Sequence, residues 1–203
     1  YFYMAFPAAS KASAAISDYY SNKQAFAQNG TLGQGETSMV TLPSEKMAVM
    51  SIADPVGKVG AAPAMGYLMV GYDDIESIQY FGNNLKAWWK EDGQVTMDEA
   101  LNLAVTEFDR ILTECNEFDR QLIEEAVNRG GEKYADLVIL AFRQSIAAHK
   151  LVRGPEGQML FFSKENFSNG SIGTVDITYP SAPLYLKYNP ALLKGMMDPI
   201  FFF

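Results

Sequence analysis

The sequence has 203 residues, 48% of them hydrophobic and 20% charged, and its formal net charge is −8 at pH 7. A chain of this length and composition can bury a core, so a disordered protein is excluded. The acidic balance, without a cluster of Lys and Arg, argues against a nucleic-acid partner, because phosphate binding needs clustered cations. No apolar run approaches about eighteen residues, so no membrane span is expected.

Two residue types that often carry chemistry occur once each, as Cys115 and His149. A single cysteine excludes a disulfide within the chain and a zinc site built on cysteines. Any nucleophile that histidine activates would have to use His149. We therefore expect neither a metal nor another cofactor.

The first 80 residues are predicted to be mostly β. Residues 1–6 are aromatic and short, and the apolar runs 45–54 and 65–74 are bounded by Pro, Gly and Asp, which predicts buried strands. Residues 8–28 have a helical composition but a broken apolar pattern, so their structure stays open.

The character of the chain changes near Ile75, where residues 75–93 predict a short helical connector. Asp73 and Asp74 stand just before it and could bind a cation. Because two adjacent carboxylates point in different directions, we expect them instead to have a structural role at the start of a helix.

The clearest helical signal begins at Thr96, a good N-cap followed by acidic residues in the first turn. Apolar residues then recur at alternating spacings of four and three, which predicts one stripe on a helix that ends at Gly130-Gly131. A break near residues 115–117 is left open. The stripe consists of Met97, Leu101, Ala104, Phe108, Ile111, Cys115, Phe118 and Leu122.

Residues 132–152 are apolar nearly all round, which predicts a helix buried on most sides and an αα-hairpin with an outer and an inner helix. A helical bundle and a ring of hairpins, an (α/α) barrel, both fit. Asp136 and Arg143 share a face and must be paired or must face a polar cavity, and we favour a structural pair. His149 is either a general base or, as we favour, a residue that packs at the helix C-terminus, where positive charge is stabilised.

The last part of the chain predicts a small β-hairpin over 151–162 and two short helices over 181–189 and 190–199, the second with Pro190 in its first turn. The chain ends on Ile200 and three Phe residues, an apolar end that soluble proteins avoid exposing. We therefore expect it to be a piece of a longer protein.

Between the hairpin and the helices lies a polar, glycine-spaced segment, Ser163–Thr174, which we call the polar loop. Together with the residues just after it, this segment could form a site. The alternative is a turn-rich connection whose Asn and Ser side chains bond their own backbone, and the residues alone favour this alternative. The candidate site residues here are Lys164, Glu165, Asn166, Asn169 and Asp176.

Several stretches together resemble the central region of the glutaminase A family: "YLMVGYDDIESIQYFG", "FDRQLIEEAVNRGGEKYADLVILAFRQSIAAHKLV" and "FFSKENFSNGSIGTVDITYPSAPLYLKYNPALLKGMMDPI". The resemblance covers roughly residues 65–203. It implies a β-sandwich followed by a six-hairpin (α/α) toroid. The chain would then be α+β, with residues 1–75 ending the β-rich domain and residues 76–203 forming the first helical hairpins and the polar loop of an incomplete toroid.

The resemblance also implies a multidomain, exported amidohydrolase that converts L-glutamine to L-glutamate and ammonia, secreted, periplasmic or at the cell surface. Within the matching segment Glu165 and Asp176 are the acid/base candidates. Arg143, Lys164, Asn166 and Asn169 are candidates for substrate contacts.

The partners that the resemblance implies are a small-molecule substrate and the remaining domains of the same polypeptide, without which the chain is expected to be inactive. Two alternatives stay open: a glycoside hydrolase acting on a sugar with two carboxylates, and a non-catalytic structural domain.

Overall fold

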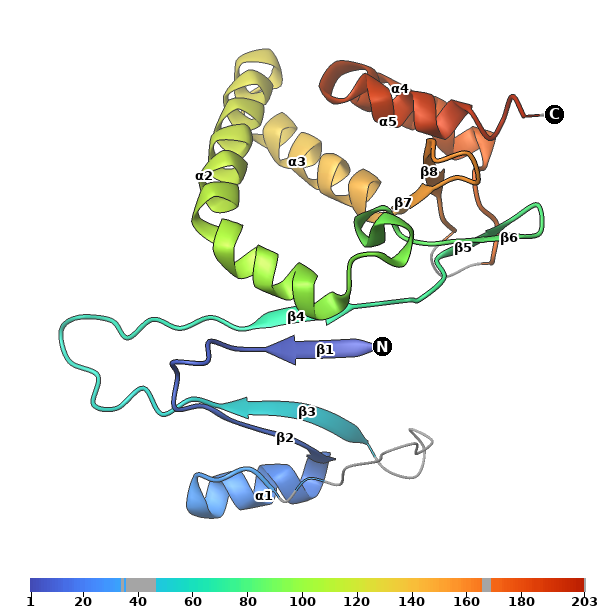
Figure 1. The fold of residues 1–203 in the computed structure, drawn as a ribbon. Coiled ribbons are helices and arrows are strands. Elements are labelled where there is room, and N and C mark those ends of the chain that lie inside the picture. Colours follow the sequence, from blue (N-terminus) through green and yellow to red (C-terminus); the bar gives the residue numbers. More distant parts are fainter. Residues whose placement is uncertain (34, 36–46, 166–168, 203) are drawn as a thin grey trace. The chain divides into compact units, whose positions relative to one another are not determined.

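The computed structural model describes residues 1–33, 35, 47–165 and 169–202. Contacts divide the chain into two compact units, Phe2–Tyr72 and Asp73–Phe203, the second of which includes Tyr1. Strands dominate the first and helices the second (Figure 1). The chain is therefore an α+β protein with a helical hairpin, as the sequence predicts.

The first unit contains two antiparallel strand pairs. Strand β1 (Phe2–Ala5) pairs with β4 (Met69–Tyr72), and β2 (Ser13–Asp18) pairs with β3 (Ala48–Ala53). The strands expected within 1–6, 45–54 and 65–74 are therefore confirmed.

Residues 8–28, left open by the sequence, divide between β2 and helix α1 (Tyr19–Asn29). Asp18 starts the helix, because its carboxylate accepts hydrogen bonds from the backbone N–H groups of Tyr20 and Ser21, both at 3.1 Å. Gly30 ends it with φ 67°, a left-handed conformation that glycine adopts without strain.

These strands are not buried as predicted. Of the described side chains in this unit, only Ser17 and Asn22 are buried, while Val70 is 67% exposed and Ile16 and Met50 are also exposed. A two-stranded sheet has two faces to cover, and the short helix α1 cannot cover both.

The second unit begins with a β-hairpin where the sequence predicted a helical connector. Strand β5 (Ile78–Tyr80) pairs with β6 (Asn83–Leu85), and a 3-10 helix, η1, follows at Trp88–Gly93. Phe81 and Gly82, with φ 45° and 80°, form the two-residue turn. Positive φ at both central residues matches the twist of the two paired strands. The chain therefore forms a hairpin here, although its composition favours a helix.

Asp73 and Asp74 form ion pairs, so their structural role is confirmed, although no helix begins there. Both carboxylate oxygens of Asp73 accept from Lys90 Nζ, at 2.8 and 2.9 Å, and Asp74 pairs with Lys150 at 2.7 Å. Burial raises the pKa of each carboxyl, but the hydrogen bonds, led by those from the lysines, lower it by more. Both pKa values therefore lie below the usual range.

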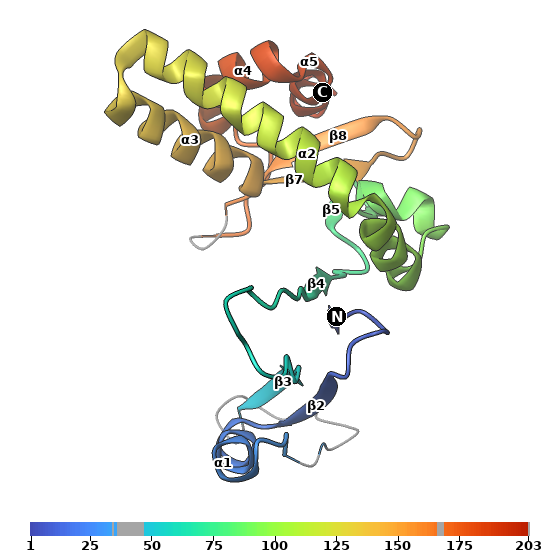
Figure 2. The ribbon, with the colours of Figure 1, turned by 90° about the vertical axis from the view of Figure 1, so that its left-hand side faces the viewer.

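Helix α2 (Met97–Gly130) runs without a break for 34 residues, so the break left open near 115–117 does not occur. Thr96 is its N-cap, as predicted, and forms a capping box with Glu99. Gly131, with φ 80°, reverses the chain into α3 (Glu132–Ala147), which runs back beside α2 (Figure 2). The predicted αα-hairpin is thus confirmed.

The burial of α3 is not as predicted. Only Ala135 is buried, whereas Leu137 is 65% exposed and Leu140 is 51% exposed. Asp136 and Arg143 are exposed as well, so neither needs a partner, and neither forms an ion pair with a described residue. A helix that is apolar all round needs neighbours on several sides, and here α2 covers one of them while helix α4 (Val175–Tyr188) adds contacts at Phe142 and Ser145.

The core of the second unit surrounds the hairpin of β7 (His149–Arg153) and β8 (Met159–Ser163), which confirms the predicted hairpin. One face packs against the β5–β6 hairpin, and the other packs against helices α4 (Val175–Tyr188) and α5 (Pro190–Met197). The buried side chains of the first face are Val152, Leu160 and Phe162, with Ile78 and Leu85. Those of the second are Phe161, Tyr185 and Met196.

The two C-terminal helices exist as predicted, with Pro190 in the first turn of α5. Helix α4 begins at Val175, before the expected residue 181, and includes Pro180 and Pro183. Helix α5 packs closely on β8: a Cβ at Gly195 would lie 3.0 Å from the Met159 carbonyl oxygen. No helix in the described ranges combines the length and the apolar character that a membrane span requires.

Candidate functional site

The polar loop continues the hairpin of β7 and β8 beyond its open end. Lys164 forms an isolated antiparallel bridge with Ile172, and Glu165 N–H donates to the Ser171 carbonyl at 3.1 Å. At the base of the loop, Gly173 N–H donates to the Ser163 carbonyl at 2.9 Å. Backbone hydrogen bonds therefore hold the two arms of the loop together.

Both sequence interpretations of this loop describe part of it. Asn169 Oδ1 accepts from Ser171 N–H at 2.7 Å, which is the self-bonding that a turn-rich connection uses. Lys164 and Glu165, however, are only half exposed. The outgoing arm is therefore partly enclosed by the fold, while Asn169 and Ser171 face solvent.

The predicted site residues are brought together only in part. Lys164, Glu165 and Asn169 share the paired loop, and Asn166 lies outside the described residues. Asp176, expected to precede the first C-terminal helix, is instead in the first turn of α4 and is exposed. Arg143 is on α3, and among the described residues neither it nor Asp176 forms an ion pair.

A cavity of about 500 Å³ adjoins the returning arm of the loop, and sequence reasoning missed it. Ile172 and Gly173 line it together with Val175, the first residue of α4. Its other described lining residues come from the β5–β6 hairpin, from β8 and from the C-terminal segment: Gln79, Tyr80, Phe81, Phe162, Pro199 and Ile200. None of the described lining residues is charged, so this wall suits an apolar group rather than a zwitterion.

The aromatic wall of this cavity is a packed group. The Tyr80 ring lies 4.6 Å from that of Phe81 and 5.4 Å from that of Phe162, measured between centroids. Phe81 has a positive φ of 45°, a conformation that costs energy for a bulky side chain. The turn sequence Phe81-Gly82 between two short strands was the signal that could have revealed this wall.

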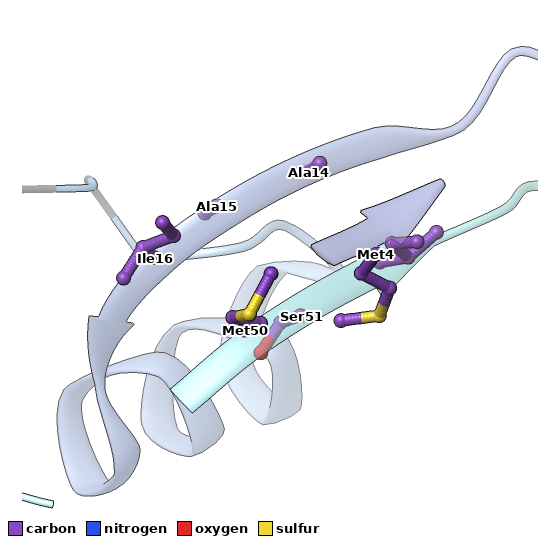
Figure 3. A pocket seen from close by; sticks show the side chains of 7 residues that line it. Met4, Ala14, Ala15, Ile16, Met50 and Ser51 are labelled. Atoms are coloured by element: carbon purple, nitrogen blue, oxygen red, sulfur yellow. The ribbon is translucent and has the colours of Figure 1, made fainter. Parts of the chain in front are cut away.

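A second cavity, of about 250 Å³, lies in the first unit (Figure 3). Met4, Ile16 and Met50 give it an apolar lining. The hydroxyl among its described lining residues, Ser51 Oγ, accepts from Asn22 Nδ2 at 2.5 Å. Since none of the described residues that line this cavity has an ionisable side chain, they offer no acid–base chemistry.

A third cavity, of about 320 Å³, lies beside the turn that joins β7 and β8, at the opposite end of this hairpin from the polar loop. Its lining is polar and includes Lys86 and Arg153. The Arg153 guanidinium stacks 4.2 Å above the Trp88 ring. Among the described residues, no group of three His, Cys, Asp or Glu side chains could hold a metal ion.

His149 packs at the C-terminus of α3, as predicted, but its charge state differs from the expectation. The imidazole stacks on Phe161 at 4.6 Å, and its Nδ1 lies 2.6 Å from the Ser145 carbonyl oxygen. Burial lowers the pKa of His149, and the hydrogen bond to Ser145 raises it by less. The neutral form is therefore favoured, because desolvation outweighs the hydrogen bond to the Ser145 carbonyl.

Two family descriptions match the chain. Residues 1–125 match a domain of unknown function, DUF5127, and residues 131–203 match the Glutaminase A six helical-hairpin domain. The boundary between the two matches falls at the turn between α2 and α3, so one helix of the hairpin belongs to each match. No solved structure matches the chain.

Two curated relatives are similar to the chain. Glutaminase A from Aspergillus oryzae is 28% identical over 182 residues, which cover 87% of this chain and 26% of that protein. A protein named "Probable glutaminase" from Arthroderma benhamiae is 33% identical over 100 residues, which cover 49% of this chain and 12% of that protein. The chain thus spans about a quarter or less of these relatives.

Proposed function

The chain belongs to the glutaminase A-like family, and on that premise we propose that it forms part of an amidohydrolase that converts L-glutamine to L-glutamate and ammonia. The observation that carries the proposal is the match of residues 131–203 to the Glutaminase A six helical-hairpin domain. That segment holds α3, the β7–β8 hairpin, the polar loop, α4 and α5. Both curated relatives are named glutaminases.

Within this function the polar loop forms one edge of the substrate site. Hydrolysis of an amide needs a group that activates water and one that protonates the leaving ammonia. Glu165, on the half-enclosed arm, is the first candidate for this acid–base work, and Asp176, two residues beyond the loop, is the second. Lys164 and Asn169 supply polar contacts to the substrate. A substrate contact by Arg143 stays a prediction from the family resemblance.

The rest of the site comes from further helical hairpins of the same polypeptide, which close a toroid with α2 and α3. Support for this comes from α3, whose apolar side chains Leu137 and Leu140 are largely exposed. Such side chains gain free energy when another helix covers them. Turnover by the 203-residue chain alone is therefore not expected.

An ammonia-release assay tests the proposed function. The product of the complete gene that encodes this chain should release ammonia from L-glutamine, and the 203-residue chain should not. Asparagine and a panel of aryl glycosides are assayed separately as alternative substrates. Hydrolysis of a glycoside without ammonia release from glutamine would replace the proposal with the sugar-hydrolase alternative.

The role of Glu165 is tested by Glu165→Gln in the complete gene product. We expect kcat to fall by at least about 100-fold, the usual effect of losing an acid–base group. Glu156→Gln is the matched control, because Glu156 is exposed at the other end of the same hairpin. Ammonia release by Glu165→Gln within a few-fold of the unmodified enzyme would rule this assignment out.

A further inference from the structure

The base of the polar loop contains buried polar atoms that no described residue satisfies. His149 Nε2 and Ser163 Oγ are both inaccessible to solvent and have no hydrogen-bond partner among the described residues. A third such atom, Thr174 Oγ1, belongs to the residue that ends the loop. Ser163 is only 1% exposed, so solvent outside the fold cannot satisfy its hydroxyl.

Strand register pairs the residues that carry two of these atoms. His149 lies directly opposite Ser163 in the β7–β8 ladder. Their neighbours Ala148 and Lys164 share a backbone hydrogen bond of 2.8 Å, which makes His149 and Ser163 a non-hydrogen-bonded pair. In such pairs the Cα atoms are about 4.5 Å apart and the two side chains lie closest. Both side chains therefore lie on one face of the hairpin.

The tautomer of His149 makes the two atoms complementary. Nδ1 lies 2.6 Å from the Ser145 carbonyl oxygen, which can only accept, so Nδ1 carries the proton. Nε2 is then a bare acceptor, and Ser163 Oγ–H is a donor with nothing to donate to. Leaving both unsatisfied inside the fold costs free energy, and buried polar groups in this situation are usually bridged by an internal water molecule.

We propose that His149 Nε2 and Ser163 Oγ bind one internal water molecule at the base of the polar loop. The water donates to Nε2 and exchanges a hydrogen bond with the serine hydroxyl. This joins the end of α3 to the point where the loop leaves β8. The inference concerns the fold at the loop base, and it holds whether or not the proposed hydrolase activity is correct.

Ser163→Ala distinguishes a hydrated pair from a dry one by the sign of its effect. If a water molecule bridges the pair, the variant removes one of its anchors, and Tm should fall by about 2–4 °C. If Ser163 Oγ has no partner, alanine removes a buried unpaired hydroxyl, and Tm should stay the same or rise. Ser171→Ala is the matched control, because its side chain is exposed on the other arm of the same loop. A rise or no change in Tm for Ser163→Ala would overturn the proposal.

Hydrogen exchange adds a readout at the site itself. The amides of Lys164 and Gly173 form the hydrogen bonds at the loop base. Their exchange should accelerate by about 10-fold or more in Ser163→Ala and stay unchanged in Ser171→Ala. A crystal structure of the 203-residue chain should show a water within about 3.2 Å of both atoms. A direct contact between Ser163 Oγ and His149 Nε2, or a dry site, would refute the water.

Discussion

In Asp73–Phe203 the β7–β8 hairpin buries apolar side chains on both faces, whereas in Phe2–Tyr72 the only buried side chains among the described residues are Ser17 and Asn22. Both units contain antiparallel strand pairs, so strand pairing does not explain the difference. What differs is the cover: the β5–β6 hairpin and helices α4 and α5 surround β7 and β8, while α1 is the only helix among the described residues of the first unit. Hydrophobic burial therefore stabilises the second unit, and backbone ladders with a few polar contacts stabilise the first.

The largest expected effect compares one substitution in the two units. Leu160→Ala, at a position 2% exposed in the second unit, should lower the free energy of unfolding by about 2–5 kcal/mol. Leu68→Ala, at a position 54% exposed in the first, should change it by less than about 0.5 kcal/mol. Urea unfolding of the two variants measures both values. Equal losses of unfolding free energy would show that Leu68 is covered in solution, and the two units would then not differ in hydrophobic burial.

A loss of intermediate size should follow from Asn22→Ala, which removes the polar centre of the first unit. Asn22 donates to Ser51 Oγ at 2.5 Å and accepts from Gly33 N–H at 2.8 Å. Losing these buried hydrogen bonds should cost about 1–3 kcal/mol. Amide exchange of β2 and β3 should accelerate while that of β7 and β8 does not. The control is Asn29→Ala, at an exposed position in the same helix. An equal loss of unfolding free energy in the two variants would show that the polar contacts of Asn22 do not stabilise the first unit.

A smaller effect is expected from pH, and it should be confined to the second unit. Because burial lowers the pKa of His149 in the folded state, the unfolded chain binds this proton more readily. Stability should be constant above about pH 7 and should fall as pH drops below about 6.5, the usual histidine value. Urea midpoints between about pH 7.5 and 5.5 measure this, and His149→Gln should flatten the profile. A profile that His149→Gln leaves unchanged would assign the pH dependence to other groups.

The smallest effect is expected on the exposed surface of α2. Hydrogen bonds from Arg120 and Gln121 lower the pKa of Glu117 to about 2, and Arg120 also pairs with Glu124 at 2.7 Å. All of these groups are exposed, so solvent and salt screen them. Arg120→Gln should leave the urea midpoint unchanged within error at physiological salt. A shift as large as that of Asn22→Ala would show that surface charges stabilise the second unit as much as burial does.

Local sequence signals predicted most of the elements. Thr96 and Glu99 place the start of α2, Gly131 its end, and Pro190 the start of α5, because caps and restricted dihedrals act over one turn. The β5–β6 hairpin was missed, since its strands are three residues each and its turn places a phenylalanine at positive φ. The apolar cavity beside the loop was missed because its wall combines residues from 79 to 200.

The sequence by itself determined the order of the elements, the helical hairpin, the β7–β8 hairpin and the resemblance to the glutaminase A family, because these depend on local patterns. The tertiary structure decided what each element faces. Strand register placed His149 opposite Ser163, and Ser163 is buried. Packing against the Tyr185 ring of α4 left the His149 imidazole half-buried, and this burial lowers its pKa. Burial is a property of neighbours distant in the chain, so the exposure of α3 and the enclosure of the loop base could not be predicted from periodicity.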